Sequence, residues 1–127
     1  MSKPTVAILG ASTSREKFGN KSVRAHLRKG YTVYPVNPRA SEVEGLPCYP
    51  SIEAIPGPID RVSFYLPPEM GLEVIELVAA KNPKEVWLNP GTESNALIQR
   101  ARDLGLNVIV ACSIVDLGLT PSQVDAE

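Results

Sequence analysis

The sequence predicts an α/β fold in which a single parallel sheet is covered by helices on both faces. Short β-branched-rich runs, such as Thr5–Leu9 and Thr32–Val36, alternate with longer segments whose apolar residues recur at helical spacing. Glycine and proline mark the boundaries between the two kinds of segment. Strands joined by helices of this length must run parallel, and right-handed crossovers put helices on both sheet faces.

The first strand–loop–helix unit contains the most informative segment of the chain. Thr5–Leu9 is followed by a polar loop, residues 10–19, and by a helix that Asn20 is expected to open and Gly30 to end. Such a turn offers backbone N–H groups and a positive helix end to a phosphate. The dinucleotide pattern G-x-G-x-x-G is absent, because Ser12 occupies the position of its second glycine. The loop is consistent with a phosphate site or with a plain strand–helix turn.

The remaining elements continue the alternation. Further strands are expected at residues 48–49, 61–66, 85–88 and 107–111. Helical segments are expected at residues 51–55, at 69–81 and from Thr92 or Glu93 to Leu104, with Gly105 just past the end. Residues 40–47 are predicted to be a loop and residues 120–127 a frayed tail. The doubly wound rule then gives the strand order 3-2-1-4-5, with residues 107–111 as a sixth strand.

Composition excludes several classes of protein. With 127 residues, 43% hydrophobic and 21% charged, the chain is expected to form one globular domain over residues 1–127. A net charge of −1 argues against a nucleic-acid ligand. No apolar segment resembles a secretory signal or approaches the roughly 20 residues of a membrane span. Cys48 and Cys112 lack metal-ligand spacing, so we expect free thiols, no metal and a cytoplasmic location.

The loop after the second strand discriminates between nucleotides. NAD-binding proteins usually carry a carboxylate there for the ribose hydroxyl, but this chain reads Asn37-Pro38-Arg39. An arginine suits an extra ribose phosphate, so NADP and coenzyme A are the two candidates, beside a surface arginine without a ligand. A hydride-transfer enzyme needs a second body of protein to seat its substrate, and this chain ends after one sheet. Length therefore favours coenzyme A.

No convincing set of catalytic residues emerges from the sequence. His26 lies in the middle of a helix, where a surface or half-buried structural role is expected. Glu69, Glu73 and Glu76 follow one helix at spacings typical of a solvated face. Cys112, at the end of the last strand, is interpreted as a small buried hydrophobic residue in preference to a partner of a bound thiol.

Several segments together resemble one known family. They are residues 6–12 (VAILGAS), 30–38 (GYTVYPVNP), 45–51 (GLPCYPS) and 86–91 (VWLNPG). The chain resembles the CoA-binding domain family, the stand-alone relatives of the N-terminal domain of the succinyl-CoA synthetase α-subunit. The resemblance implies a Rossmann-like fold and coenzyme A as ligand. It also implies diphosphate binding at the first loop, adenosine binding after the second strand and pantetheine binding after the later strands.

Loop composition and resemblance together give the candidate ligand-binding residues. The first loop contributes Gly10, Ala11, Ser12, Thr13, Ser14 and Lys17. The later loops contribute Val36, Asn37, Arg39, Leu66, Pro67, Pro68, Asn89, Pro90 and Gly91. Gly10 is expected to let the backbone approach the diphosphate, so Gly10→Val should abolish binding in a protein that stays folded.

The sequence departs from the family at the pantetheine end. Many members have Gln where Asn89 stands, and a lysine follows the cysteine at the position of Ser113-Ile114. The synthetase's phosphorylated histidine belongs to a second domain, so no ligase activity is implied. The sequence predicts a small cytoplasmic protein that binds coenzyme A or acyl-CoA without catalysis of its own. It leaves open a homo-oligomer or partner enzyme, an NADP- or other nucleotide-binding subunit, and an interaction protein with a decayed site.

Overall fold

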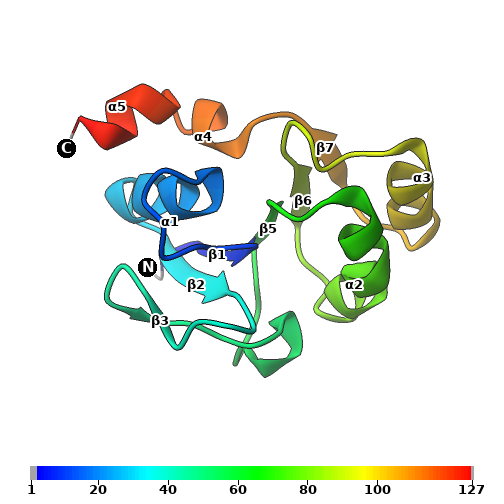
Figure 1. Cartoon of the computed structure of the whole chain (residues 1–127). Helices are drawn as coiled ribbons and strands as arrows, with labels where there is room; N and C mark the ends of the chain where they lie inside the picture. The colour runs from blue at the N-terminus through cyan, green and yellow to red at the C-terminus, as the bar shows by residue number, and fades with distance from the viewer. Residues whose placement is uncertain (1–2, 127) are drawn as a thin grey trace.

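The computed structural model describes residues 3–126 and contains one five-stranded parallel sheet (Figure 1). Its strands are β1 (Thr5–Leu9), β2 (Thr32–Val36), β5 (Arg61–Phe64), β6 (Glu85–Leu88) and β7 (Val108–Val110). They are ordered β2-β1-β5-β6-β7, and each neighbouring pair is parallel. Tyr49 adds a single parallel bridge outside β2, opposite Val36. The doubly wound order is therefore confirmed, although the predicted strand at 48–49 is reduced to one bridge.

Helices cover both faces of the sheet, as the pattern predicted (Figure 1). Alternate β1 residues point in opposite directions: Ala7 and Leu9 join the core with α2 (Pro68–Ala80) and α3 (Asn95–Asp103). Val6 and Ile8 pack with Val23 of α1 (Phe18–Arg28). The short helices α4 (Ser113–Asp116) and α5 (Pro121–Asp125) extend the cover on the α1 side. Within residues 3–126, no helix is both long and apolar enough to span a bilayer.

The first helix begins earlier than the sequence indicated. The predicted N-cap, Asn20, is wrong: α1 starts at Phe18 with Lys17 at the N-cap position. The Asn20 side chain is fully buried, and its amide donates to the Ser12 carbonyl at 2.8 Å and to Glu44 Oε2 at 3.0 Å. Its amide therefore bonds to the preceding loop and to Glu44 instead of capping the helix.

Two predicted irregular regions are ordered. Residues 40–47, predicted to be a loop, form an antiparallel hairpin of β3 (Glu42–Val43) and β4 (Leu46–Pro47). Its turn residues, Glu44 and Gly45, both have positive φ, the geometry of a tight two-residue hairpin turn. Residues 121–125 of the predicted frayed tail form α5, which Thr120 and Gln123 cap reciprocally.

Smaller differences concern element ends. The helix α3 is capped by Ser94, whose hydroxyl accepts from the Leu97 N–H, instead of by Thr92 or Glu93. The single helical turn at 51–55 is present as the 3₁₀ helix η1 (Ile52–Ala54). Strand β5 ends at Phe64, two residues earlier than predicted, because Tyr65 and Leu66 leave the sheet. Those two residues become important for the site.

An ionic cluster around the buried Arg61 lies at the opposite end of the sheet from the predicted ligand loops. Arg61 of β5 donates to Asp116 at 2.8 Å and to Glu85 at 3.0 Å, and its guanidinium stacks on Trp87. His26, the only histidine of the chain, is fully buried beside it, with Nε2 3.5 Å from Arg61 Nη1. The prediction of a surface or half-buried histidine underestimated this burial.

We expect His26 to make folding stability depend on pH. Burial lowers the pKa of His26 from 6.5 to about 4, against the raising effect of its hydrogen bond to the Ser22 carbonyl. The unfolded chain therefore takes up a proton as the pH falls from 6.5 towards 4, while the native protein does not. The part of the unfolding free energy that depends on neutral His26 is fully present above pH 6.5. It is lost progressively as the pH falls towards 4, by up to about 3 kcal/mol. Urea unfolding at pH 7 and pH 4.5 should give a smaller acid loss for His26→Gln than for wild type. Equal acid losses of unfolding free energy in the two proteins would show that His26 is not the group responsible.

Candidate functional site

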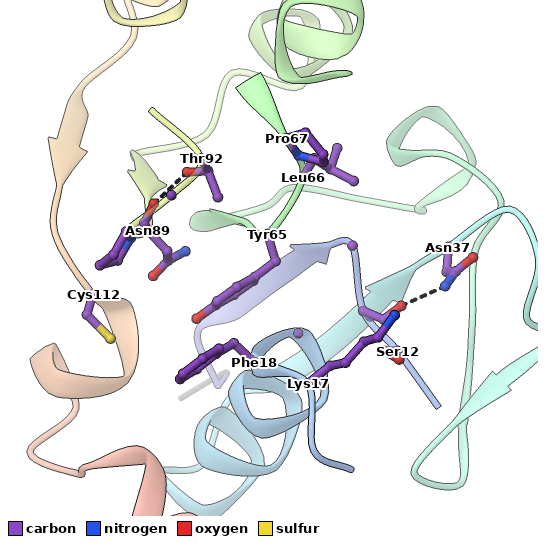
Figure 2. A pocket seen from close by; sticks show the side chains of 15 residues that line it. Ser12, Lys17, Phe18, Asn37, Tyr65, Leu66, Pro67, Asn89, Thr92 and Cys112 are labelled. Carbon is purple, nitrogen blue, oxygen red and sulfur yellow. Dashed lines mark hydrogen bonds between the residues drawn. The ribbon is translucent and has the colours of Figure 1, made fainter. Parts of the chain in front are cut away.

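Two cavities open along the carboxyl edge of the sheet, where parallel α/β folds bind ligands. The larger, of about 560 Å³, lies between the first loop, the start of α1 and the ends of β5 and β6 (Figure 2). We call it the loop cavity. The second, of about 490 Å³, lies between the end of β2, η1 and α2. We call it the groove. They meet at Gly10, Asn37 and Leu66, which line both.

The first loop is held by side chains that bind its carbonyl groups. The Asn37 amide donates to the Ala11 carbonyl, and the Asn20 amide to the Ser12 carbonyl, each at 2.8 Å. Arg24 donates to the Arg15 carbonyl, also at 2.8 Å. All these acceptors are therefore occupied by the protein itself and turned towards their donors.

Several N–H groups of the same loop are left without a protein acceptor. Among residues 3–126, no hydrogen bond occupies the N–H groups of Ser12 and Thr13, or those of Phe18 and Gly19 in the first turn of α1. Those of Gly10 and Ala11 are used, because both donate to the Val36 carbonyl at 3.1 and 3.3 Å. The N-terminal end of α1 also has no side-chain cap. Ser12, Phe18 and Gly19 line the loop cavity, so this end of it can receive an anion.

Two glycines bring the strand, the loop and the helix into close contact. Gly10 has φ of +89°, and a Cβ there would lie 2.7 Å from the Tyr65 carbonyl oxygen. A Cβ on Gly19 would overlap the Gly10 carbonyl oxygen. The start of α1 therefore approaches β1 as closely as backbones can, although the G-x-G-x-x-G pattern is missing.

The basic residues around the site differ in their availability. Arg15 is paired with Glu44, and both Lys21 and Arg24 are paired with Asp125. Lys17 lines the loop cavity and Arg39 lines the groove, both with exposed side chains. Neither has an ion-pair partner among residues 3–126. Lys17 and Arg39 are thus the cations that an anionic ligand meets first.

The groove is lined mainly by apolar side chains. Its walls are mostly aliphatic, and they include Val36, Ile52, Met70, Val74 and Leu77. Arg39 and Ser51 add polar groups to this lining. The arrangement therefore joins an apolar slot with one unpaired positive charge.

The ends of β5 and β6 form a closed hydrogen-bonded cluster under the loop cavity. Asn89 is buried; its amide donates to Ser63 Oγ and the Phe64 carbonyl, both at 2.8 Å. Its side-chain oxygen accepts from the Ser113 N–H at 2.8 Å. The Tyr65 hydroxyl lies 3.2 Å from Ser113 Oγ, and burial raises the pKa of Tyr65. The Asn89 side chain is thus committed to the protein.

Most of the sequence-predicted residues come together around these cavities. Lining the loop cavity are Gly10, Ala11, Ser12, Lys17, Asn37, Leu66, Pro67, Asn89, Pro90 and Gly91. Val36 and Arg39 line the groove. Thr13, Ser14 and Pro68 are not among the lining residues of either cavity. The Ser14 N–H donates to Ser12 Oγ at 3.0 Å, and Pro68 is the first residue of α2.

The sequence reasoning missed several lining residues. The additional ones in the loop cavity are Phe18, Gly19, Tyr65 and Thr92, together with Cys112, which was expected to be buried. Tyr65 was assigned to a strand, and Phe18 to a polar loop. Cys48 and Cys112 are both free and half-buried. A signal for Phe18 was available, since an aromatic residue in an otherwise polar loop has no core to join.

Comparison with known proteins identifies the family. Residues 4–118 match the family described as CoA binding domain. The chain belongs to the CoA-binding domain family. It is 34% identical over 116 residues to the alpha subunit of ADP-forming acetate–CoA ligase II from Pyrococcus furiosus, covering 82% of this chain and 25% of that one. It is 35% identical over 77 residues to ADP-forming acetate–CoA ligase I from Archaeoglobus fulgidus, covering 61% of this chain and 11% of that one.

Solved structures include a protein of similar size. A hypothetical protein from Pyrococcus horikoshii OT3 superposes with a TM-score of 0.81 at 36% identity, covering 87% of this chain and 78% of that one. The CoA-binding domain thus spans only a small part of the ligases it matches but most of this structural neighbour. The predicted family and the Rossmann-like fold are confirmed.

Proposed function

We propose that this CoA-binding domain binds coenzyme A or an acyl-CoA along the groove and the loop cavity. The observation that carries the proposal is an apolar slot beside unpaired Arg39, next to a loop in which several N–H groups lack acceptors among residues 3–126. The adenine would occupy the groove between Val36 and Val74, with Arg39 near the ribose 3′-phosphate. The family match supports coenzyme A as the ligand.

The diphosphate would lie where the two cavities meet. There it would accept hydrogen bonds from the Ser12 N–H group and from the first turn of α1, beside Lys17. The pantetheine arm would then follow the loop cavity past Leu66 and Pro90 towards Cys112. In this arrangement Gly10 and Asn89 act as structural supports for the site, because their polar groups are already used.

We propose no catalytic role for the domain by itself. Its only histidine, His26, is buried beside Arg61 at the opposite end of the sheet from both cavities. The matched ligase from Pyrococcus is named as an alpha subunit, which favours a module that works with a partner enzyme. A single domain acting in the cytoplasm is part of the same proposal.

We expect Arg39→Ala to weaken coenzyme A and to leave 3′-dephospho-CoA almost unchanged. A hydrogen bond to a charged group contributes about 1.5–3 kcal/mol, or roughly 10- to 150-fold in affinity. Calorimetric titration of wild type and Arg39→Ala with both ligands measures this effect as a cycle. Arg102→Ala, which removes an exposed arginine from α3 away from the groove, is the matched control.

The outcomes separate the candidate functions. Tight binding of coenzyme A, with weaker binding of NADP and NAD, supports the proposal. Preference for NADP would favour the nucleotide-binding subunit, and binding of none of them would favour a decayed site. Equal losses for coenzyme A and 3′-dephospho-CoA in Arg39→Ala would mean that Arg39 does not read the 3′-phosphate.

A further inference from the structure

Two consecutive residues at the start of α1 point to opposite ends of the loop cavity. Figure 2 shows the Lys17 side chain extending towards Ser12 and Asn37, on the side that meets the groove. The Phe18 ring extends the other way, below the Tyr65 ring and towards Cys112. The cavity therefore has a cationic end next to the groove and an aromatic end away from it, which we call the distal end.

The distal end is apolar in its chemistry. Phe18 is 54% exposed and lines the loop cavity, so part of its ring is available to a ligand. The Tyr65 hydroxyl lies against Ser113, which leaves the ring as cavity wall. Cys112 adds a half-buried thiol. Such a surface favours hydrocarbon over charged groups, because the Phe18 ring makes no hydrogen bonds and the Tyr65 hydroxyl is already bonded to Ser113.

The polar groups next to the distal end are already satisfied. Asn89 and Ser113 bond to each other and to the ends of β5. The Thr92 hydroxyl donates to the Asn89 carbonyl at 2.7 Å. No donor in this cluster is left over to bind a ligand carboxylate.

Among residues 3–126, no cation without an ion-pair partner lies at this end. Lys21 lies above the Phe18 ring, 5.2 Å from its centroid, but its ammonium is paired with Asp125 at 3.0 Å. Lys17 points towards the opposite end, where the proposed diphosphate would bind. A ligand carboxylate at the distal end would therefore lose water without gaining a cation.

We infer that the distal end is a subsite for a short, uncharged acyl group carried as a thioester on coenzyme A, with Phe18 as its specificity-determining residue. This inference rests on the proposed function, in which the adenosine occupies the groove and the thiol reaches the far end of the loop cavity. It assigns butyryl-like thioesters as ligands and excludes dicarboxylic ones such as succinyl-CoA.

Calorimetric titration with coenzyme A, acetyl-CoA, butyryl-CoA and succinyl-CoA tests the subsite. Affinity should rise about fourfold for each buried methylene, so butyryl-CoA, with two more methylenes, should bind roughly fifteenfold more tightly than acetyl-CoA. Succinyl-CoA should bind more weakly than butyryl-CoA by at least the same factor. Coenzyme A itself should bind in every case, which keeps the two proposals distinguishable.

Two substitutions of Phe18 provide the decisive comparison. Phe18→Ala should reduce the butyryl-to-acetyl ratio to less than threefold while the affinity for free coenzyme A stays within twofold. Phe18→Arg supplies the missing cation and should shift the preference towards succinyl-CoA. Leu27→Ala, at a 38% exposed aliphatic residue of α1 that does not line the loop cavity, should leave all ratios unchanged.

The failures of the two proposals look different. If wild type binds none of the four ligands, both the function and the subsite are wrong. If coenzyme A binds but butyryl-CoA binds no more tightly than acetyl-CoA, only the subsite is wrong. Unaltered chain-length preference in Phe18→Ala, with the fold intact by circular dichroism, would also overturn the role of Phe18.

Discussion

Replacing Gly19 by alanine is expected to destabilise the protein by at least about 3 kcal/mol, because the new methyl group would overlap backbone. The atom it meets is the Gly10 carbonyl oxygen, at the point where β1 ends and α1 begins. Neither the end of β1 nor the start of α1 can move without disturbing other contacts, since both belong to the tightly packed centre of the fold. Urea unfolding followed by circular dichroism measures the loss.

Gly30→Ala is the matched control for this effect. Gly30 has φ of +86°, but a Cβ there would meet nothing within 4 Å. Its replacement should therefore cost only the backbone strain of the left-handed region, about 1–2 kcal/mol. A Gly19→Ala protein no less stable than Gly30→Ala would show that α1 can move away from β1 without penalty.

The close approach of backbone around Gly10 also changes the expected effect of Gly10→Val. From the sequence alone, Gly10→Val is expected to leave a folded protein that fails to bind ligand. In the structure, a Cβ on Gly10 lies 2.7 Å from the Tyr65 carbonyl, and the positive φ disfavours a branched residue. The substitution would damage the fold before it tests the phosphate site. Gly19 instead supplies the close helix–strand contact that the third glycine of G-x-G-x-x-G supplies elsewhere.

Features governed by local periodicity could be predicted from the sequence. Alternating β-branched strands and amphipathic helices gave the sheet order, because the rules for parallel crossovers leave few arrangements. The hairpin of β3 and β4 was missed since two-residue strands carry no periodic signal, although Gly45 marked its turn. The helix α5 was missed although Thr120 and Gln123 have the spacing of a capping box.

The candidate site was predictable where backbone or charge decides the role. The cavity linings include the small residues of the first loop and Arg39, which were chosen on those grounds. The roles of Asn20 and Asn89 could not be predicted, because an asparagine that holds a ligand and one that holds backbone look alike in a sequence. Both are buried and bonded to carbonyl groups of distant or preceding segments.

Asn20 and Arg24 form a chain of hydrogen bonds that links the C-terminal helix α5 to the first loop. Arg24 is only 6% exposed and donates from Nε to the Asn20 side-chain oxygen at 2.8 Å. That bond fixes the amide so that its nitrogen faces the Ser12 carbonyl. Arg24 is itself held by Asp125 of α5 at 3.0 Å. The direction of the loop N–H groups therefore depends on side chains that do not line the loop cavity.

Asn20→Asp is expected to weaken coenzyme A at least tenfold while the protein stays folded. Aspartate has the same shape and keeps its attraction to Arg24, but it cannot donate to the Ser12 carbonyl, and it faces Glu44. The released Ser12 carbonyl can then turn towards the diphosphate, and the two negative groups repel each other. The loss of one hydrogen bond from the loop to a charged ligand corresponds to roughly a tenfold or greater loss of affinity. Adenosine 3′-phosphate, which lacks the diphosphate, should bind wild type and variant alike.

Asn107→Asp controls for the change of amide to acid, since the Asn107 amide donates to the Lys84 carbonyl at 3.3 Å and lines neither cavity. Competition titrations with both ligands, on proteins whose unfolding is checked in urea, separate positioning from stability. A folded Asn20→Asp protein with unchanged affinity for coenzyme A would mean that the loop does not need its carbonyl held. An equal loss for adenosine 3′-phosphate would mean that the substitution disturbs the groove as well, and the diphosphate would then not be the group that Asn20 serves.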